Sequence, residues 1–125
     1  MSTLKVGIAS YEEMKALTLA VARGQRRLAP NEPRIWFPST ESFAKVLSAA
    51  NRDLLRVIAE QAPASLDELA RLTGRQKSNL SRTLKTMANY GLLRLERGPR
   101  GRVAAKVVHD RIELELLLGR SAAAA

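Results

Sequence analysis

Two stretches between residues 65 and 91 repeat apolar side chains with the spacing of an α-helix. The first has its leucines on one side and is followed by Gly74, which can adopt the positive φ that ends a helix. The second has Leu80, Leu84 and Met87 on one side and stops at a second glycine, Gly91. The pattern predicts two helices joined by a sharp turn, which is a helix-turn-helix.

Two helix starts are marked by a serine that is followed three residues later by a glutamate. Ser65 and Glu68 have this capping-box spacing, and so do Ser10 and Glu13. The serine hydroxyl and the glutamate carboxylate together satisfy backbone N–H groups that lack a partner in the first helical turn. We therefore expect the helix-turn-helix to begin at Ser65, and an earlier helix to run from Ser10 to Gly24.

After Gly91 the pattern changes from helical to alternating. Residues 92–97 are typical of a strand, residues 98–101 (Gly-Pro-Arg-Gly) of a turn, and residues 102–108 of a returning strand. A helix-turn-helix followed by such a β-hairpin is a winged helix. We expect the arginines around the turn to lie at the tip of the wing.

Two more helices are predicted in front of the helix-turn-helix. Ser39 or Thr40 can cap the first of them, and Asn51 is expected to cap the second, which Ala62-Pro63 ends. The second helix would support the helix-turn-helix with its apolar face. The predicted core of the winged helix consists of Leu54, Leu55, Ile58, Leu66, Leu69, Leu80, Leu84, Met87, Leu92, Leu95 and Val107.

Strands are predicted near both ends of the chain. Residues 3–8 and 111–116 alternate apolar with polar side chains, as strands with one buried face do. The connector between residues 25 and 38 contains prolines that disfavour a helix, but residues 34–37 can form a short strand. We interpret Trp36 and Phe37 in that strand as a hydrophobic anchor, with a ligand pocket as the alternative.

The length of 125 residues suits one domain with attachments. The fold class is α+β: a winged helix-turn-helix domain with an N-terminal strand-helix extension and a C-terminal strand. We expect the extension and its linker over residues 1–38, the winged-helix domain over 39–110, and the C-terminal strand and a tail over 111–125.

The charge of the chain is concentrated in the second helix and the wing. The net charge is +9, and residues 75–106 hold nine basic residues against Glu96 alone, so 9 − 1 = +8 of it lies there. A concentrated basic patch indicates a protein that binds a polyanion. An anionic membrane surface is the competing partner, but these residues do not lie on one long amphipathic helix with bulky apolar residues opposite.

The polar face of the second helix carries the chemistry for nucleic-acid recognition. Ser78, Arg82 and Lys85 point away from its apolar stripe, and no acidic residue occurs between Arg75 and Tyr90. Guanidinium and amide groups suit base edges in the major groove, and hydroxyls and lysines suit phosphates, whereas a merely solvated face would mix both signs. The predicted DNA-binding residues are Arg75, Gln76, Lys77, Ser78, Asn79, Ser81, Arg82 and Lys85 of the helix-turn-helix and Arg97, Arg100 and Arg102 of the wing.

Other functions find little support in the sequence. Cysteine is absent and His109 is the only histidine, so we expect no metal site, no cofactor and no catalytic residues. The turn at residues 98–101 is not a phosphate-binding loop. No apolar run reaches the ~20 residues that span a bilayer, and the chain is expected to be cytoplasmic.

The run from Leu69 to Leu93 and the wing that follows it resemble the winged-helix regulators of the MarR type. Their recognition helix often carries a serine-arginine pair and ends in a glycine-leucine step into the wing, which Ser81-Arg82 and Gly91-Leu92 match. The resemblance covers roughly Asn51 to Val108 and implies a winged-helix fold and DNA binding. The whole chain also resembles small prokaryotic winged-helix proteins described as regulators or antitoxins, which implies a partner toxin.

The helix from Ser10 and the terminal strands are the candidate interaction surfaces. The apolar stripe of Met14, Leu17 and Val21 can pack on the chain's own winged-helix domain or form a homodimer interface. The two terminal strands can pair within one chain or between two, with Lys5 near Glu113 or Glu115. An alternative is an edge that binds a partner protein by strand addition.

Two functions follow from these patterns. The first is a sequence-specific regulator of transcription that binds double-stranded DNA, as a dimeric repressor. The second is an antitoxin or protein-interaction module that neutralises a partner protein and regulates its own operon.

Overall fold

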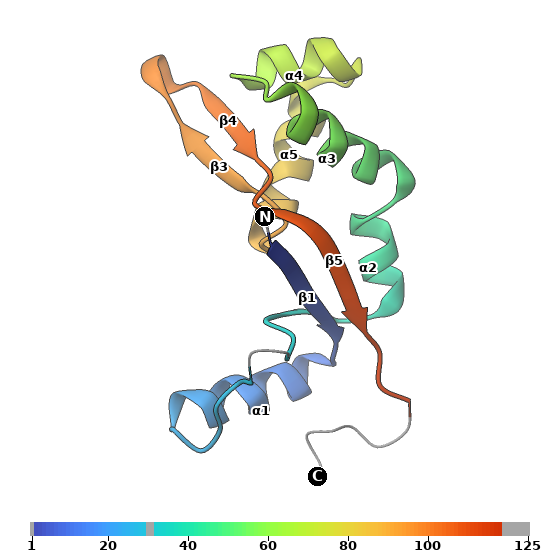
Figure 1. Ribbon diagram of the computed structural model, residues 1–125, viewed down its shortest axis with the longest axis vertical. Helices are drawn as coiled ribbons and strands as arrows, with labels where there is room; N and C mark the ends of the chain where they lie inside the picture. Colours follow the sequence, from blue (N-terminus) through green and yellow to red (C-terminus); the bar gives the residue numbers. More distant parts are fainter. Residues whose placement is uncertain (1, 30–31, 119–125) are drawn as a thin grey trace. The chain divides into compact units, whose positions relative to one another are not determined.

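The computed structural model describes residues 2–29 and 32–118 and forms two compact units (Figure 1). One contains Ser2 and residues 44–110, and the other contains residues 3–29, 32–43 and 111–118. The elements in chain order are β1 (Ser2–Ile8), α1 (Tyr11–Ala22), β2 (Ile35–Phe37), α2 (Thr40–Val46), α3 (Ala49–Gln61), α4 (Leu66–Thr73), α5 (Lys77–Asn89), β3 (Arg94–Arg97), a 3-10 turn (Pro99–Gly101), β4 (Val103–Lys106) and β5 (His109–Glu115).

The unit of residues 44–110 is a winged helix-turn-helix, so the predicted fold is confirmed. Helices α4 and α5 are joined by a turn at Gly74, whose φ of 72° ends α4 as expected. After α5, Gly91 has a φ of 75° and leads into the hairpin of β3 and β4. These two strands are antiparallel, with Arg94 opposite Lys106 and Arg97 opposite Val103.

The core of this unit is built mainly from the predicted leucines. Seven predicted core residues are buried, namely Leu54, Ile58, Leu69, Leu80, Leu84, Met87 and Leu92. Leu55, Leu66, Leu95 and Val107 are only half-buried, which corrects their assignment to the core. Leu93 and Ala105 are buried instead. Leu93 is buried because β3 begins two residues later than predicted, so both residues of the Leu92-Leu93 pair turn inward before the strand.

The helix caps confirm some of the predicted starts and correct one. The Ser65 hydroxyl accepts from the backbone N–H of Glu68 at 3.1 Å, but the Glu68 carboxylate accepts from Ala64 at 3.0 Å and not from Ser65 itself. Asn51 does not cap α3. That helix begins at Ala49, and Ser48 is its cap, accepting from the backbone N–H of Asn51 at 3.2 Å.

The second unit is built on a three-stranded sheet in the order β2-β1-β5. Strand β2 is parallel to β1, with Gly7 opposite Trp36 and Ile8 opposite Phe37. Strand β1, helix α1 and strand β2 therefore form a β-α-β unit. Phe37 is fully buried, and its ring meets the Phe43 ring edge-on with the two ring centroids 5.2 Å apart. Trp36 is half-buried.

The predicted pairing of the two terminal strands within one chain is confirmed. Strand β5 lies beside β1 and runs in the same direction (Figure 1). The Lys5 ammonium lies 3.7 Å from the Glu113 carboxylate, as expected. The sequence-based division treated the two ends as separate attachments, whereas the sheet joins them in one unit. The predicted tail, residues 119–125, lies outside the described residues.

Helix α1 starts at a complete capping box. The Ser10 hydroxyl accepts from the Glu13 N–H, and the Glu13 carboxylate accepts from the Ser10 N–H, each at 3.1 Å. The backbone N–H of Ser10, and then its hydroxyl, lower the pKa of Glu13 from 4.5. The helix buries none of its residues: Met14 and Leu17 are half-buried and Val21 is 39% exposed.

Candidate nucleic-acid interface

Helix α5 is held by its apolar side and offers its polar side to solvent. Leu80, Leu84 and Met87 are each at most 1% exposed, so the rotation of the helix about its axis is well determined. The opposite face is exposed along its whole length, as predicted. Its exposed polar residues are Lys77, Ser78, Asn79, Arg82, Lys85, Thr86 and Asn89, with Gln76 exposed at the N-cap.

The N-terminus of α5 has no acidic residue in its first turn and no side-chain cap. Its backbone N–H groups and the positive end of the helix dipole therefore remain open to an anion, such as a backbone phosphate. Lys77, the first residue of the helix, lies 2.9 Å from the carboxylate of Asp67 in α4. Both side chains are more than half exposed, so this ion pair is weak and can be exchanged for another anion.

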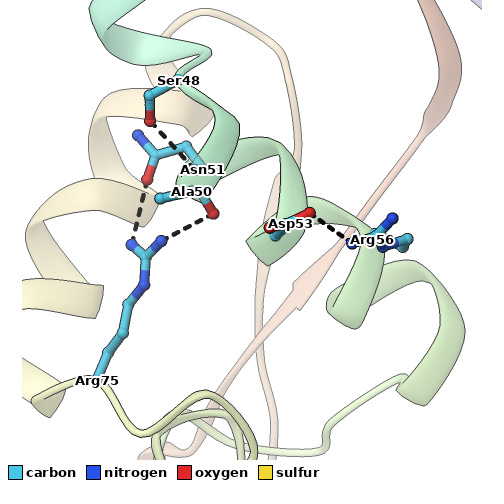
Figure 2. A network of polar contacts seen from close by, with 6 residues as sticks. All are labelled: Ser48, Ala50, Asn51, Asp53, Arg56 and Arg75. Atoms are coloured by element: carbon cyan, nitrogen blue, oxygen red, sulfur yellow. Dashed lines mark hydrogen bonds and ion pairs between the residues drawn. The ribbon is translucent and has the colours of Figure 1, made fainter.

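Arg75 does not lie on the exposed face of α5. It lies in the turn before the helix, and its guanidinium points back to the start of α3 (Figure 2). One nitrogen donates to Asn51 Oδ1 at 3.1 Å and another donates to the carbonyl of Ala50 at 2.9 Å. Asn51 in turn donates through Nδ2 to the carbonyl of Val46 at 2.9 Å. Arg75 therefore ties the turn to α3.

The wing presents the three predicted arginines to solvent. Arg97, Arg100 and Arg102 are exposed, and Arg100 has a φ of 61° at the tip. The Gly98 N–H donates to the Arg102 carbonyl at 2.7 Å and closes the turn. The lone acid of the wing, Glu96, lies 3.5 Å from Arg94 on the same strand, so it partly neutralises Arg94.

A groove lies between α5 and the wing and brings together predicted site residues from both. Ser81 and Lys85 line it from α5, and Arg97 lines it from β3. Its apolar lining consists of Leu66, Leu84, Leu95 and Val103. Lys85 and Arg97 form no ion pair with a described residue, so two positive charges border an apolar floor.

Asn51 and Asp67 lie near the site, but the sequence does not predict their contacts with site residues. The sequence predicts Asn51 as a cap, but its side chain accepts from Arg75, and no sequence pattern connects Asp67 with Lys77. Asn51 lies 24 positions before Arg75, and no local pattern reveals a contact of that separation. Within residues 2–29 and 32–118 there is no group of three histidine or acidic residues that could hold a metal, and no helix long and apolar enough to cross a membrane.

Comparisons with known proteins place these features in a family. The family model HVO_A0114 matches residues 46–114, which include α3, α4, α5, the wing and most of β5. A solved structure, the crystal structure of the predicted DNA-binding transcriptional regulator from E. coli, is 20% identical, with a TM-score of 0.44 over 81% of this chain and 86% of that chain. No curated protein matches the chain.

Proposed function

The chain belongs to the HVO_A0114 family, and we propose that its winged-helix unit binds double-stranded DNA in a sequence-specific manner to regulate transcription. One observation carries this proposal. The exposed face of α5 has hydrogen-bond donors and positive charge but no acidic residue, and it adjoins a wing with three exposed arginines. A helix of this kind fits the major groove, and the wing then lies along the phosphate backbone.

Arg82 is the residue that we assign to base reading. It is exposed in the middle of α5, opposite the buried Leu80 and Leu84, and forms no ion pair with a described residue. A free guanidinium can donate two hydrogen bonds to the O6 and N7 of guanine. Ser78 and Asn79 lie nearer the N-terminus of the helix, where side chains reach base edges next to those that Arg82 reads.

Phosphate contacts are assigned to Lys77, Lys85 and the wing arginines. Lys77 would leave Asp67 for a phosphate at the N-terminus of α5, where Gln76 and the free N–H groups add donors. Lys85 and Arg97 border the groove between α5 and the wing from its two sides, so one strand of the DNA backbone can contact both. Arg100 and Arg102 would extend these contacts along the backbone.

Arg75 is assigned a different role from the one predicted. Its guanidinium donates to two oxygens at the start of α3, so this side chain is directed to α3 and not to the exposed face of α5. We propose that Arg75 positions the turn that leads into α5 and that its effect on DNA is indirect.

A dimeric repressor is the specific form of this function that we propose. Two recognition helices about one turn of DNA apart would read a palindromic operator, and covering that operator would block transcription. Neutralisation of a partner toxin was the alternative prediction, and it rests on sequence resemblance alone.

The test compares two arginine variants on a selected DNA site. The site is first selected from random duplexes with the purified chain at ~0.15 M salt, so that generic phosphate binding is suppressed. Arg82→Ala is expected to lose ~1–3 kcal/mol of discrimination at one base position, because one bidentate contact is removed. Arg52→Ala removes the same charge from an exposed position on α3 and should leave discrimination unchanged. Equal discrimination in wild type and Arg82→Ala would refute the assignment of the base-reading residue.

A further inference from the structure

We propose that strand β5 is an interface with a second copy of this chain, in which the two β5 strands pair antiparallel and join two three-stranded sheets into one six-stranded sheet. The purpose of this dimer, to bring two winged-helix units to one operator, rests on the proposed function. The interface itself depends on the sheet alone and is tested without DNA.

Among the described residues, no strand pairs with the outer side of β5, and β5 has neither the shortness nor the prolines that protect many sheet edges. It is the last strand in the order β2-β1-β5, it is seven residues long and it contains no proline. The opposite edge, β2, has only three residues and lies between Pro33 and Pro38, which cannot donate backbone hydrogen bonds. Strand addition is therefore favoured at β5 and disfavoured at β2.

Exposed apolar side chains gather in the same unit as this edge. Among the described residues, every large exposed hydrophobic side chain except Leu72 belongs to the sheet unit. Leu114 is 38% exposed on β5, and Leu116, just after it, is 51% exposed. Removing apolar surface of this kind from water by covering it with a partner lowers the free energy of the complex. The unit therefore has both an open backbone edge and apolar side chains beside it.

The charges of β5 favour one symmetric register. Directly opposite residues of antiparallel strands point to the same face of the sheet, and side chains alternate between the faces along each strand. In a symmetric pair, a residue therefore lies opposite either its own copy or a residue an even number of positions away. The two-fold axis must then pass through a residue and not between two. With the axis at Ile112, the seven-residue strands overlap fully, and Arg111 faces Glu113 of the second copy on both sides of the axis. An axis at Glu113 would place Arg111 opposite Glu115, but it would also oppose the Glu113 carboxylate to its own copy and leave both ends of the strands without overlap. An axis at Leu114 would oppose Glu113 to Glu115.

Opposite charges across the strands attract and like charges repel, so the charge pattern favours the register with its axis at Ile112, which has no pair of like charges, over its neighbours. Lys5 and Arg111 of the same chain lie 3.7 Å and 3.9 Å from the Glu113 carboxylate. Glu113 therefore sits among cations from its own sheet before the second copy adds another. A second copy of this chain has the same alternation of charged and apolar residues and therefore fits this edge.

The first experiment reverses the charges and measures the molecular mass in solution by sedimentation equilibrium at micromolar concentration. Arg111→Glu alone and Glu113→Arg alone each place like charges opposite one another and should shift the chain from dimer to monomer. An equimolar mixture of the two variants should regain the dimer, because each repulsive pair becomes attractive in the mixed species. Arg71→Glu, an equal change at an exposed position of α4, should leave the dimer intact.

The second experiment does not depend on whether Glu113→Arg disturbs the ion pair with Lys5. The chain has no cysteine, so Ile112→Cys introduces a single thiol that would lie directly opposite its copy, within the distance of a disulfide. Mild oxidation should then give a covalent dimer from Ile112→Cys and little from Leu114→Cys, which would face Asp110 of the second copy.

Three results would overturn the proposal. They are a monomeric wild type at these concentrations, a dimer that persists in Arg111→Glu, and a covalent dimer from Leu114→Cys but not from Ile112→Cys. None of them bears on DNA binding by the winged-helix unit, because a monomeric variant can still bind a single half-site through α5. A wild-type chain that forms the dimer but does not bind DNA half-sites would instead count against the proposed function.

Discussion

The guanidinium of Arg75 donates a hydrogen bond to Asn51 Oδ1 at 3.1 Å and joins the turn of the helix-turn-helix to the first turn of α3. A second bond to the Ala50 carbonyl at 2.9 Å makes the contact two-pronged (Figure 2). The side chain is half-buried, and Asn51 is itself held by Ser48 and Val46. A basic residue that charge alone would assign to DNA is thus part of the scaffold that orients α5.

We expect Arg75→Ala to lower the free energy of unfolding by about 1–3 kcal/mol, because it leaves Asn51 Oδ1 and a backbone carbonyl without their charged donor. Arg75→Lys should lose most of this stability as well, since an ammonium does not reproduce the two-pronged geometry. Urea denaturation measures both variants. A phosphate contact would behave differently: Arg75→Lys would keep wild-type stability and DNA affinity, and that result would contradict the positioning role.

We expect removal of the three wing arginines to change the salt dependence of DNA binding and not its base preference. Each lost phosphate contact should reduce the slope of log K against log salt by about 0.9, so Arg97, Arg100 and Arg102 together account for roughly 2–3. The measurement is a titration of the selected duplex at several salt concentrations.

Arg94→Ala is the matched control for the wing, because Arg94 lies beside Glu96 on the same strand. Its removal should change the slope less than the removal of any one of the three. A triple variant with an unchanged slope would show that the wing does not touch the backbone.

Gly7 is required by the ring of Trp36. A Cβ atom added at Gly7 would lie 2.6 Å from Trp36 Cε3 and 3.2 Å from Pro33 Cγ, well inside van der Waals contact. We expect Gly7→Ala to destabilise the sheet unit by about 1–3 kcal/mol, as overpacking does in a filled site. Trp36 is the only tryptophan, so its fluorescence reports displacement of the ring directly.

Gly98→Ala provides the control for this change. The added Cβ would lie 3.9 Å from the Arg102 carbonyl, an ordinary contact, so stability and fluorescence should hardly move. Unchanged fluorescence and stability in Gly7→Ala would mean that the Trp36 ring has room to shift, contrary to the close approach seen here.

Local patterns predicted the elements of the winged helix with small errors. The glycines at 74 and 91 have the positive φ expected of them, and the hairpin, its turn and the exposed face of α5 lie where the periodicity places them. Each of these features depends on residues within a few positions of one another. The wrong assignment of the α3 cap to Asn51 was also local, because Ser48, three residues earlier, also has a side-chain oxygen that can accept from a backbone N–H of the first helical turn.

The sequence by itself determined the helix periodicity, the turn glycines and the net charge of α5 and the wing, because these are properties of neighbouring residues. Only the tertiary structure decided which charged groups are free. It directs Arg75 to Asn51, pairs Lys77 with Asp67, brings Lys85 and Arg97 to one groove, and leaves β5 as the edge of a sheet whose central strand comes from the other end of the chain. These contacts join residues far apart in the sequence, and they depend on how helices and strands pack, which no local pattern specifies.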